Sequence, residues 1–184
     1  MDIQEAQSLE SIFIQIGSIL TKMEWPYSIS TRRTTYSIDH TFFGEDMPLY
    51  ISVLGPLSIV AAISTYPCIC PPDRIPGCME LISLINWGLP YGNFEIHIAS
   101  GAVRFKNTID FSDTSIDDQL IETLLESAHY NINYYAYLIY DYIFNNKSPQ
   151  ESLKSTKAGV HPIKYGLEKV KNSVAYKSLR SVCH

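Results

Sequence analysis

Apolar and polar residues alternate from residue 94 to residue 109, and this pattern limits the fold more than any other in the 184-residue chain. The sequence ASGA predicts a turn between two strands, FEIHI and VRFKNTI. Strict alternation indicates that one face of the hairpin is buried and that the other faces water or a partner. The residues expected on the buried face are Phe94, Ile96, Ile98, Val103, Phe105 and Ile109; the other face includes Glu95, His97, Arg104 and Lys106.

Three helices are predicted around this hairpin. Apolar residues recur at helical spacing over residues 7–23, 73–87 and 115–144. Ile14 lies off the apolar stripe of the first helix, which indicates that this helix is covered on two sides. The third helix is long for a globular protein, and its second half is rich in tyrosine.

The sequence also predicts how the second and third helices begin. Asp73 is expected to cap the second helix, and Thr114 or Ser115 the third, because short polar side chains accept hydrogen bonds from the first turn. Met79 and Leu120 lie on the stripes that these helices are expected to bury.

Two or three further strands are predicted before the second helix. Residues 27–41 are rich in threonine, serine and tyrosine, and Gly55-Pro56 separates two apolar segments of the kind that forms strands. The sequence FFGEDMP, residues 42–48, is typical of a loop. The element order is therefore α-β-β-β-α-β-β-α, an α+β fold in which helices flank an antiparallel sheet.

A fourth helix follows the long one. Ser148 is expected to cap it, with Pro149 at its first position and Glu151 completing a capping box. We assign residues 1–158 to one α+β domain and residues 159–184 to a basic C-terminal extension.

Three of the four cysteines fall within the sequence YPCICPPDRIPGC, residues 66–78. Cys68 and Cys70 form a C-x-C pair, and a zinc site is conceivable if Cys183 and His184 close it from the end of the chain. The alternative is that Cys68, Cys70 and Cys78 are small apolar residues in a loop and at a helix start. We expect no metal here.

Composition argues against a nucleic acid or a membrane as partner. The formal net charge is −5 and no basic patch is visible, which is unlike a nucleic-acid-binding protein. The longest uncharged stretch, residues 47–72, contains Gly55 and several prolines and fits two strands better than a membrane span. The polar, acidic start does not resemble a signal peptide, so we expect a cytoplasmic protein.

Candidate catalytic groups are sparse. Asp110, Asp113, Asp117 and Asp118 lack the spacing of a calcium loop and fit turn and helix-capping roles. No nucleophile or phosphate-loop motif occurs in the chain. We therefore expect no catalytic residue and no cofactor, although a pair of carboxylates from distant segments stays open as an alternative.

The segments INWGLPYGNFEI, GAVRFKNTID and KSPQES, in this order around the hairpin and the long helix, resemble the YbjN domain family. The fold of that family is similar to that of type III secretion chaperones. The resemblance implies an antiparallel sheet flanked by helices, frequent assembly as a homodimer and no catalytic residues. Family members are described as sensory-transduction regulators or as chaperone-like proteins.

We therefore expect a non-enzymatic, chaperone-like or regulatory protein that binds another polypeptide. Tyrosine is common at interfaces, although the rings of the long helix fit packing against the sheet equally well. The alternative is a regulator that senses a small molecule in a pocket between the sheet and the long helix. The candidate protein-binding residues are Phe94, Ile96, Arg104, Lys106, Tyr130, Tyr134, Tyr137 and Tyr140.

Overall fold

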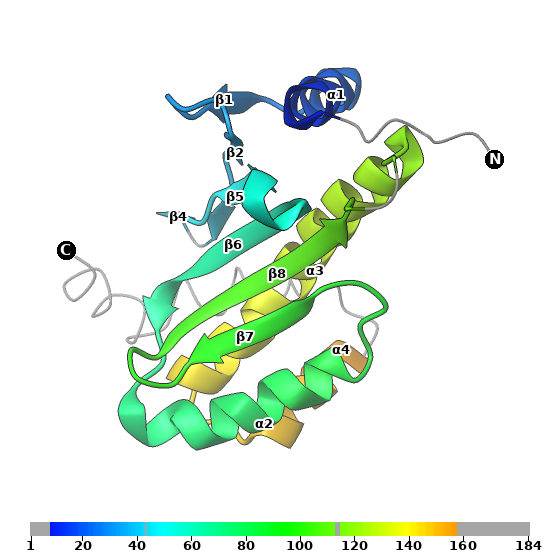
Figure 1. The fold of residues 1–184 in the computed structure, drawn as a ribbon. Coiled ribbons are helices and arrows are strands. Elements are labelled where there is room, and N and C mark those ends of the chain that lie inside the picture. The colour runs from blue at the N-terminus through cyan, green and yellow to red at the C-terminus, as the bar shows by residue number, and fades with distance from the viewer. Residues whose placement is uncertain (1–7, 43, 113–114, 158–184) are drawn as a thin grey trace.

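The computed structural model describes residues 8–42, 44–112 and 115–157 (Figure 1). It contains helices, strands and two short 3-10 turns, η1 (Gly55–Leu57) and η2 (Pro72–Arg74). The other elements are α1 (Leu9–Lys22), β1 (Tyr27–Ile29), β2 (Thr35–Ile38), β3 (Thr41–Phe42), β4 (Glu45–Asp46), β5 (Leu49–Leu54), β6 (Ile59–Ile69), α2 (Ile75–Asn86), β7 (Asn93–His97), β8 (Ala102–Asp110), α3 (Asp118–Phe144) and α4 (Pro149–Lys157).

The main sheet has six strands in the order β1-β2-β5-β6-β8-β7. Every neighbouring pair in it is antiparallel, which confirms the predicted α+β fold with an antiparallel sheet. The prediction of a loop at residues 42–48 is wrong, because Thr41 and Phe42 pair with Asp46 and Glu45 in a separate two-stranded sheet. Strands of two residues are too short to produce a periodic pattern.

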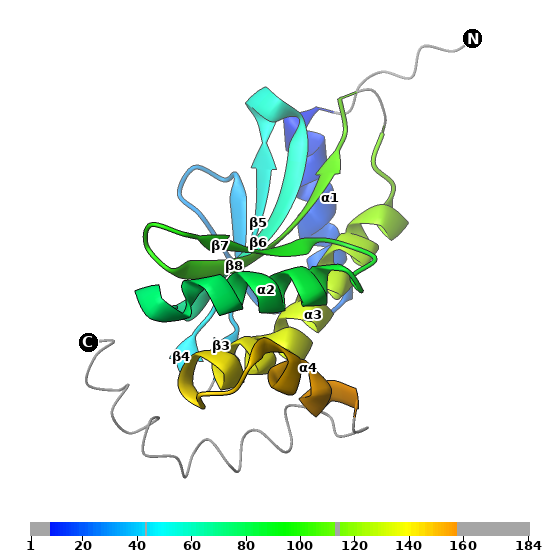
Figure 2. The same cartoon turned by 90° about the horizontal axis from the view of Figure 1, so that it is seen from below.

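The helices pack on one side of the main sheet, as α3 and α4 show in Figure 2. α1 contacts β5, α3 crosses β6 and β8, and α2 lies along β7. The strand residues that face the helices are buried, and Leu49, Ile51 and Val60 are among them. The other face of the sheet is turned toward the viewer in Figure 1, where no described helix covers it.

The hairpin of β7 and β8 follows the predicted alternation in its centre. Phe94, Val103 and Phe105 are buried, as expected. Ile98 is 60% exposed, which contradicts the prediction, because β7 ends at His97 and Ile98 lies in the turn. The outer edge of β7 is covered by Asn86 of α2, whose amide accepts from the Phe94 nitrogen at 2.9 Å and donates to its oxygen at 3.0 Å.

The second helix begins differently from the prediction. Asp73 lies in η2, and the residue before the first turn of α2 is Arg74, which provides no side-chain cap. Ile75, Ile82 and Ile85 are buried as predicted, but Met79 is 43% exposed, and Cys78 and Leu81 are fully buried, so the buried stripe is broader than predicted and excludes Met79. The cause is α4, which packs against α2 in addition to the sheet.

The third helix begins after the predicted caps. Asp117 caps α3 by accepting a hydrogen bond from the Leu120 nitrogen at 2.7 Å, so the prediction of Ser115 is wrong and Thr114 lies outside the described residues. Leu120 is 43% exposed, contrary to its predicted place on the buried stripe. A carboxylate interacts more strongly than a hydroxyl with the positive end of the helix dipole, which favours Asp117 as the cap.

The start of the fourth helix is confirmed. The Glu151 carboxylate accepts from the Ser148 nitrogen at 2.8 Å, and the Glu151 nitrogen donates to the Ser148 hydroxyl at 3.3 Å, which is a capping box. The predicted extension at residues 159–184 lies outside the described residues.

Candidate functional site

The structure buries part of the tyrosine-rich half of α3. Tyr137 and Tyr140 are 7% and 3% exposed, so their predicted place on a binding surface is wrong. They face the core because α3 is covered by the sheet on one side and by α2 and α4 on another. Tyr130 is 58% exposed and stacks on the half-buried Tyr134, with their ring centroids 5.5 Å apart.

The candidate residues of the hairpin fall on both faces of the sheet. Phe94 is buried and Ile96 half-buried on the side of the helices, so Phe94 is not part of a surface. Arg104 is exposed and Lys106 half-buried on the opposite face. The sheet therefore separates these two cations from Tyr130 and Tyr134, and the candidates do not form one continuous site.

Arg104 is engaged by its neighbour on β7. Its guanidinium forms an ion pair with Glu95 at 2.6 Å. Burial alone would raise the pKa of the Glu95 carboxyl, but the hydrogen bonds from Arg104 and Asn93 and the charges of Arg104 and Lys106 together outweigh it, so that pKa is lowered. Because both side chains are partly exposed, such a pair adds little to stability, about 0–1 kcal/mol.

Where α3 lies on β6 and β8, the described residues leave little room for the predicted pocket. The space bounded by Ser64, Tyr66 and Phe105 on the sheet and Ile132 and Ala136 on α3 measures about 10 Å³. A volume of this size is roughly that of one water molecule, far below the several hundred Å³ of small-molecule sites. Large side chains on both sides fill the interface between α3 and the sheet.

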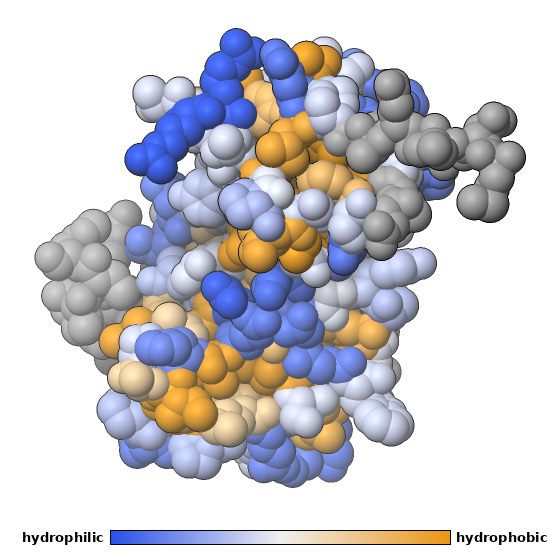
Figure 3. Space-filling view, viewed as in Figure 1, coloured by the Kyte–Doolittle hydropathy of each residue, from blue (hydrophilic) through white to orange (hydrophobic). Residues whose placement is uncertain are grey.

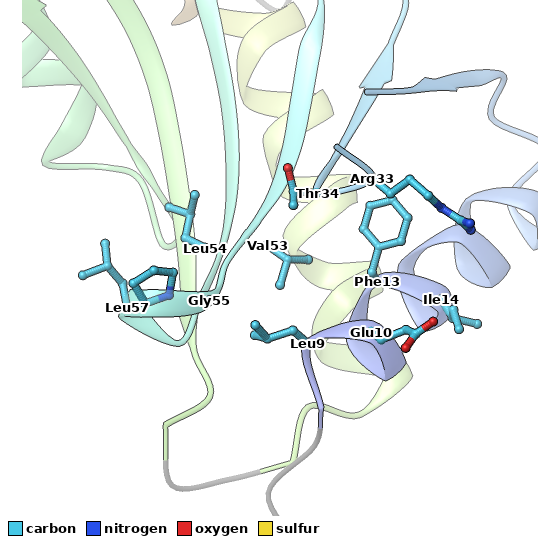
Figure 4. A pocket seen from close by; sticks show the side chains of 11 residues that line it. Leu9, Glu10, Phe13, Ile14, Arg33, Thr34, Val53, Leu54, Gly55 and Leu57 are labelled. Carbon is cyan, nitrogen blue, oxygen red and sulfur yellow. The ribbon is translucent and has the colours of Figure 1, made fainter. Parts of the chain in front are cut away.

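An apolar groove lies instead between α1 and the turn that joins β5 to β6. Its volume is about 680 Å³. The residues that line it are Leu9, Glu10, Phe13, Ile14, Arg33, Thr34, Val53, Leu54, Gly55, Pro56 and Leu57. In Figure 4, Leu54 and Leu57 lie on one side, Ile14 and Arg33 lie on the other, and Leu9, Phe13 and Val53 lie between them.

Tight local packing fixes the shape of this groove. Leu9 lies against Gly55, where a β-carbon would be 2.4 Å from a Leu9 methyl carbon. The Val53 nitrogen donates to the Thr34 oxygen at 2.9 Å, which holds the turn before β2 against the end of β5. Arg33 has a φ of +51°, a left-handed conformation that is uncommon for residues other than glycine and is often found at functional sites.

The surface around the groove is apolar as well. Figure 3 shows hydrophobic residues gathered at the end of the molecule where α1 and the β5–β6 turn lie, with a hydrophilic band over β7 and β8 below them. Ile14, which the sequence places off the buried stripe of α1, is one of the exposed walls. The sequence predicted that α1 is covered on two sides, and the exposure of Ile14 contradicts that prediction among the described residues.

The cysteine-rich segment is part of the core. Cys68 lies in β6 and Cys78 on α2, and Cys68, Cys70 and Cys78 are all buried, so the loop predicted at Cys68 is wrong. Burial raises the pKa of the Cys70 thiol and raises that of Cys78 far more. Cys183 and His184, the other members of the zinc hypothesis, lie outside the described residues.

These thiols are expected to react slowly in the folded protein. In a Cys183→Ser variant, a soluble thiol reagent at pH 8 should modify the native chain about 100-fold more slowly than the urea-unfolded chain, because the reactive thiolate is disfavoured and shielded. The rate is measured from the absorbance of the coloured leaving group that the reagent releases when it modifies a thiol. Rapid modification of the native variant, or one zinc ion retained per wild-type chain, would contradict the assignment of these cysteines to the core.

The acidic cluster takes the predicted structural roles where it is described. Asp110 accepts a hydrogen bond from the Ser112 nitrogen at 2.8 Å, and this bond lowers the pKa of the Asp110 carboxyl. Across residues 8–42, 44–112 and 115–157, no three histidine, cysteine, aspartate or glutamate side chains are grouped so that they could hold a metal ion. In the same part of the chain, no helix has the length and apolarity needed to cross a membrane.

Comparison with known proteins identifies the family. Residues 15–136 match the model of the YbjN family, described as "Putative bacterial sensory transduction regulator". Among solved structures, the chain is similar to YbjN from E. coli at 7% identity, with a TM-score of 0.49 over 69% of this chain and 87% of that chain. No curated protein matches it. Because the family model spans well over half of its length, the chain belongs to the YbjN family.

Proposed function

We propose that this chain is a non-enzymatic regulator that binds another polypeptide, and that the groove between α1 and the β5–β6 turn receives an apolar segment of that partner. The exposed aliphatic walls of the groove carry the proposal. Leu9, Ile14, Leu54 and Leu57 expose 47%, 59%, 37% and 63% of their area. Apolar side chains gathered at a surface in this way mark interaction sites in soluble proteins.

The form of the groove favours a polypeptide over a small molecule. Small ligands bury most of their surface in enclosed pockets, whereas the walls here stand apart (Figure 4) and Ile14 and Leu57 are exposed. A helix or strand laid over the walls would cover Ile14 and Leu57 together. Among the described residues that line the groove, only Glu10 and Arg33 are ionisable, so the segment is expected to be amphipathic, with apolar residues on one face.

Binding is tested with peptides selected from a random displayed library against the full chain. Affinities are then measured by fluorescence anisotropy for the wild type and for an Ile14→Gln/Leu57→Gln variant. We expect binding to weaken at least about tenfold, because each substitution removes an apolar contact worth on the order of 1 kcal/mol. Both side chains are exposed, so the fold should tolerate the changes.

The matched control is Ile69→Gln, since Ile69 is 67% exposed but lies at the far end of β6. It should bind the selected peptides within about twofold of wild type. Equal binding by the groove variant, or selection of peptides without apolar residues, would overturn the proposal. The predicted homodimer is checked by light scattering: a wild-type dimer that the groove variant dissociates would assign the groove to a second copy and overturn the proposed partner.

A further inference from the structure

Two histidines from distant parts of the chain meet beside α3. The Nε2 atom of His40, between β2 and β3, lies 2.9 Å from the Nδ1 atom of His129 on α3. The Trp25 ring, in the connection after α1, packs on His129 with the ring centroids 4.8 Å apart. Asn133, one turn along α3, donates to the His129 backbone oxygen at 2.8 Å and lies 3.5 Å from His40 Nε2.

The distance between the two nitrogens implies a shared proton. One ring must donate and the other must accept, so the contact exists only while the facing nitrogen of one imidazole is unprotonated. If both rings each take up an extra proton, the second of these places two cations at hydrogen-bond distance in a half-buried site. Burial lowers the pKa of both rings, and the charge of His129 lowers that of His40 further.

The elements around His40 and His129 provide little negative charge to stabilise two protonated rings. The carboxylates nearest in sequence are Glu24 beside Trp25, Asp39 beside His40 and Glu126 one turn before His129, and all three are exposed. Among the described residues, no ion pair joins a carboxylate to either ring. Asn133, whose side-chain nitrogen lies 3.5 Å from His40 Nε2, is neutral.

We propose that His40 and His129 form an acid-sensitive latch, which joins the β2–β3 connection to α3 at neutral pH and opens when the pair takes up a second proton. The connection is anchored to the core next to the latch, because the Met47 nitrogen donates to the His40 oxygen at 2.8 Å and Met47 is buried. Opening therefore loosens the segment that leads into β5. This device is independent of the groove and of the proposed partner.

The direction of the pH dependence follows from proton uptake on unfolding. An unfolded histidine titrates near pH 6.5, and both folded rings titrate lower, so the folded chain binds fewer protons between those values. Stability from the latch is complete above about pH 6.5 and is lost as the pH falls through the lowered folded values. Each histidine changes the unfolding equilibrium constant by at most about tenfold per pH unit.

Trp25 offers a local reporter, since the chain has two tryptophans and a Trp87→Phe variant leaves Trp25 alone. Its fluorescence and the urea midpoint are followed from pH 7.5 to pH 5 in the presence of EDTA. We expect quenching of Trp25 by the protonated His129 ring and a falling urea midpoint, both centred below about pH 6.5. His40→Asn and His129→Gln in the same background should remove most of the pH dependence.

The control is His97→Gln, because His97 is exposed and its Nδ1 atom lies 2.8 Å from the Ser100 hydroxyl of the turn, away from His40 and His129 in the fold. This variant should keep the full pH response. Wild-type imidazole titrations by NMR decide the case even if a latch variant fails to fold: two coupled transitions below about pH 6.5 support the latch. Independent titration of both rings at or above that pH, or an unchanged pH response in both latch variants, would overturn it.

Discussion

Replacing Gly101 with alanine is expected to lower the free energy of unfolding by roughly 3–5 kcal/mol, one of the two largest effects we expect from a single substitution. Gly101 is buried in the turn between β7 and β8 and has a φ of +72°, which strains alanine and most other residues that have a β-carbon. An added β-carbon would also lie 2.1 Å from the backbone oxygen of Cys70.

That close approach is part of how β6 meets the hairpin. The Gly101 nitrogen donates to the His97 oxygen at 2.8 Å, and the Gly101 oxygen accepts from the Cys70 nitrogen at 2.8 Å. Because the clash involves backbone on both sides, it can be relieved only by breaking one of these bonds. A flexible side chain could move away, but the Cys70 carbonyl cannot.

Urea unfolding followed by circular dichroism measures the effect, with Gly88→Ala as the matched control. A β-carbon at Gly88 would meet nothing closer than the Ile85 oxygen at 3.7 Å, so that variant should stay within about 0.5 kcal/mol of wild type. Asn tolerates a positive φ but has a β-carbon, so Gly101→Asn should be almost as unstable as Gly101→Ala. A Gly101→Ala variant no less stable than Gly88→Ala would contradict the close contact.

The sequence predicted the long periodic elements of the fold because their burial is encoded locally. Alternation in β7 and β8, the apolar stripe of α1 and the capping box at Ser148 each require only neighbouring residues. The sequence failed where a distant contact decided the outcome. A loop was predicted at Cys68, yet β6 runs through Pro67 to Ile69, with an irregularity between Thr65 and Ile69 where its pairing with β8 is interrupted.

The candidate site was harder to predict for the same reason. Six tyrosines on one helix fit an interface or a core equally well, and the elements packed around α3 decide which of them are buried. The groove draws its walls from α1, the turn before β2 and the β5–β6 turn, segments with no local pattern in common. The off-stripe position of Ile14 predicted cover on two sides of α1 and gave no indication of a groove.

The second large effect is expected at Arg74, at the start of α2. Its guanidinium lies over the ring of Tyr142, 4.2 Å from the centroid, and donates to the backbone oxygens of Tyr142 and Lys147. It also donates to the Asn146 side chain at 3.0 Å. The Tyr142 hydroxyl in turn donates to the Arg74 backbone oxygen at 2.9 Å.

The bond to the Tyr142 oxygen satisfies a carbonyl in the last turn of α3, and the bond to the Lys147 oxygen holds the connection between α3 and α4. They also tie the first turn of α2 to the last turn of α3. Arg74→Ala would leave the Tyr142 and Lys147 oxygens without this donor and would remove the cation from the ring, so we expect a loss of about 2–4 kcal/mol in the free energy of unfolding. Arg74→Lys should recover less than half of it, because an ammonium cannot reproduce the planar fork.

The matched control is Arg104→Ala, which removes an exposed ion pair with Glu95 and should cost less than about 1 kcal/mol. Tyr142→Phe tests the contact between Arg74 and Tyr142 from α3, since it removes only the bond to the Arg74 oxygen and should cost about 1 kcal/mol. All four variants are compared by urea unfolding at one pH. Equal losses for Arg74→Ala and Arg104→Ala would show that the guanidinium of Arg74 is solvated in solution and does not close the end of α3.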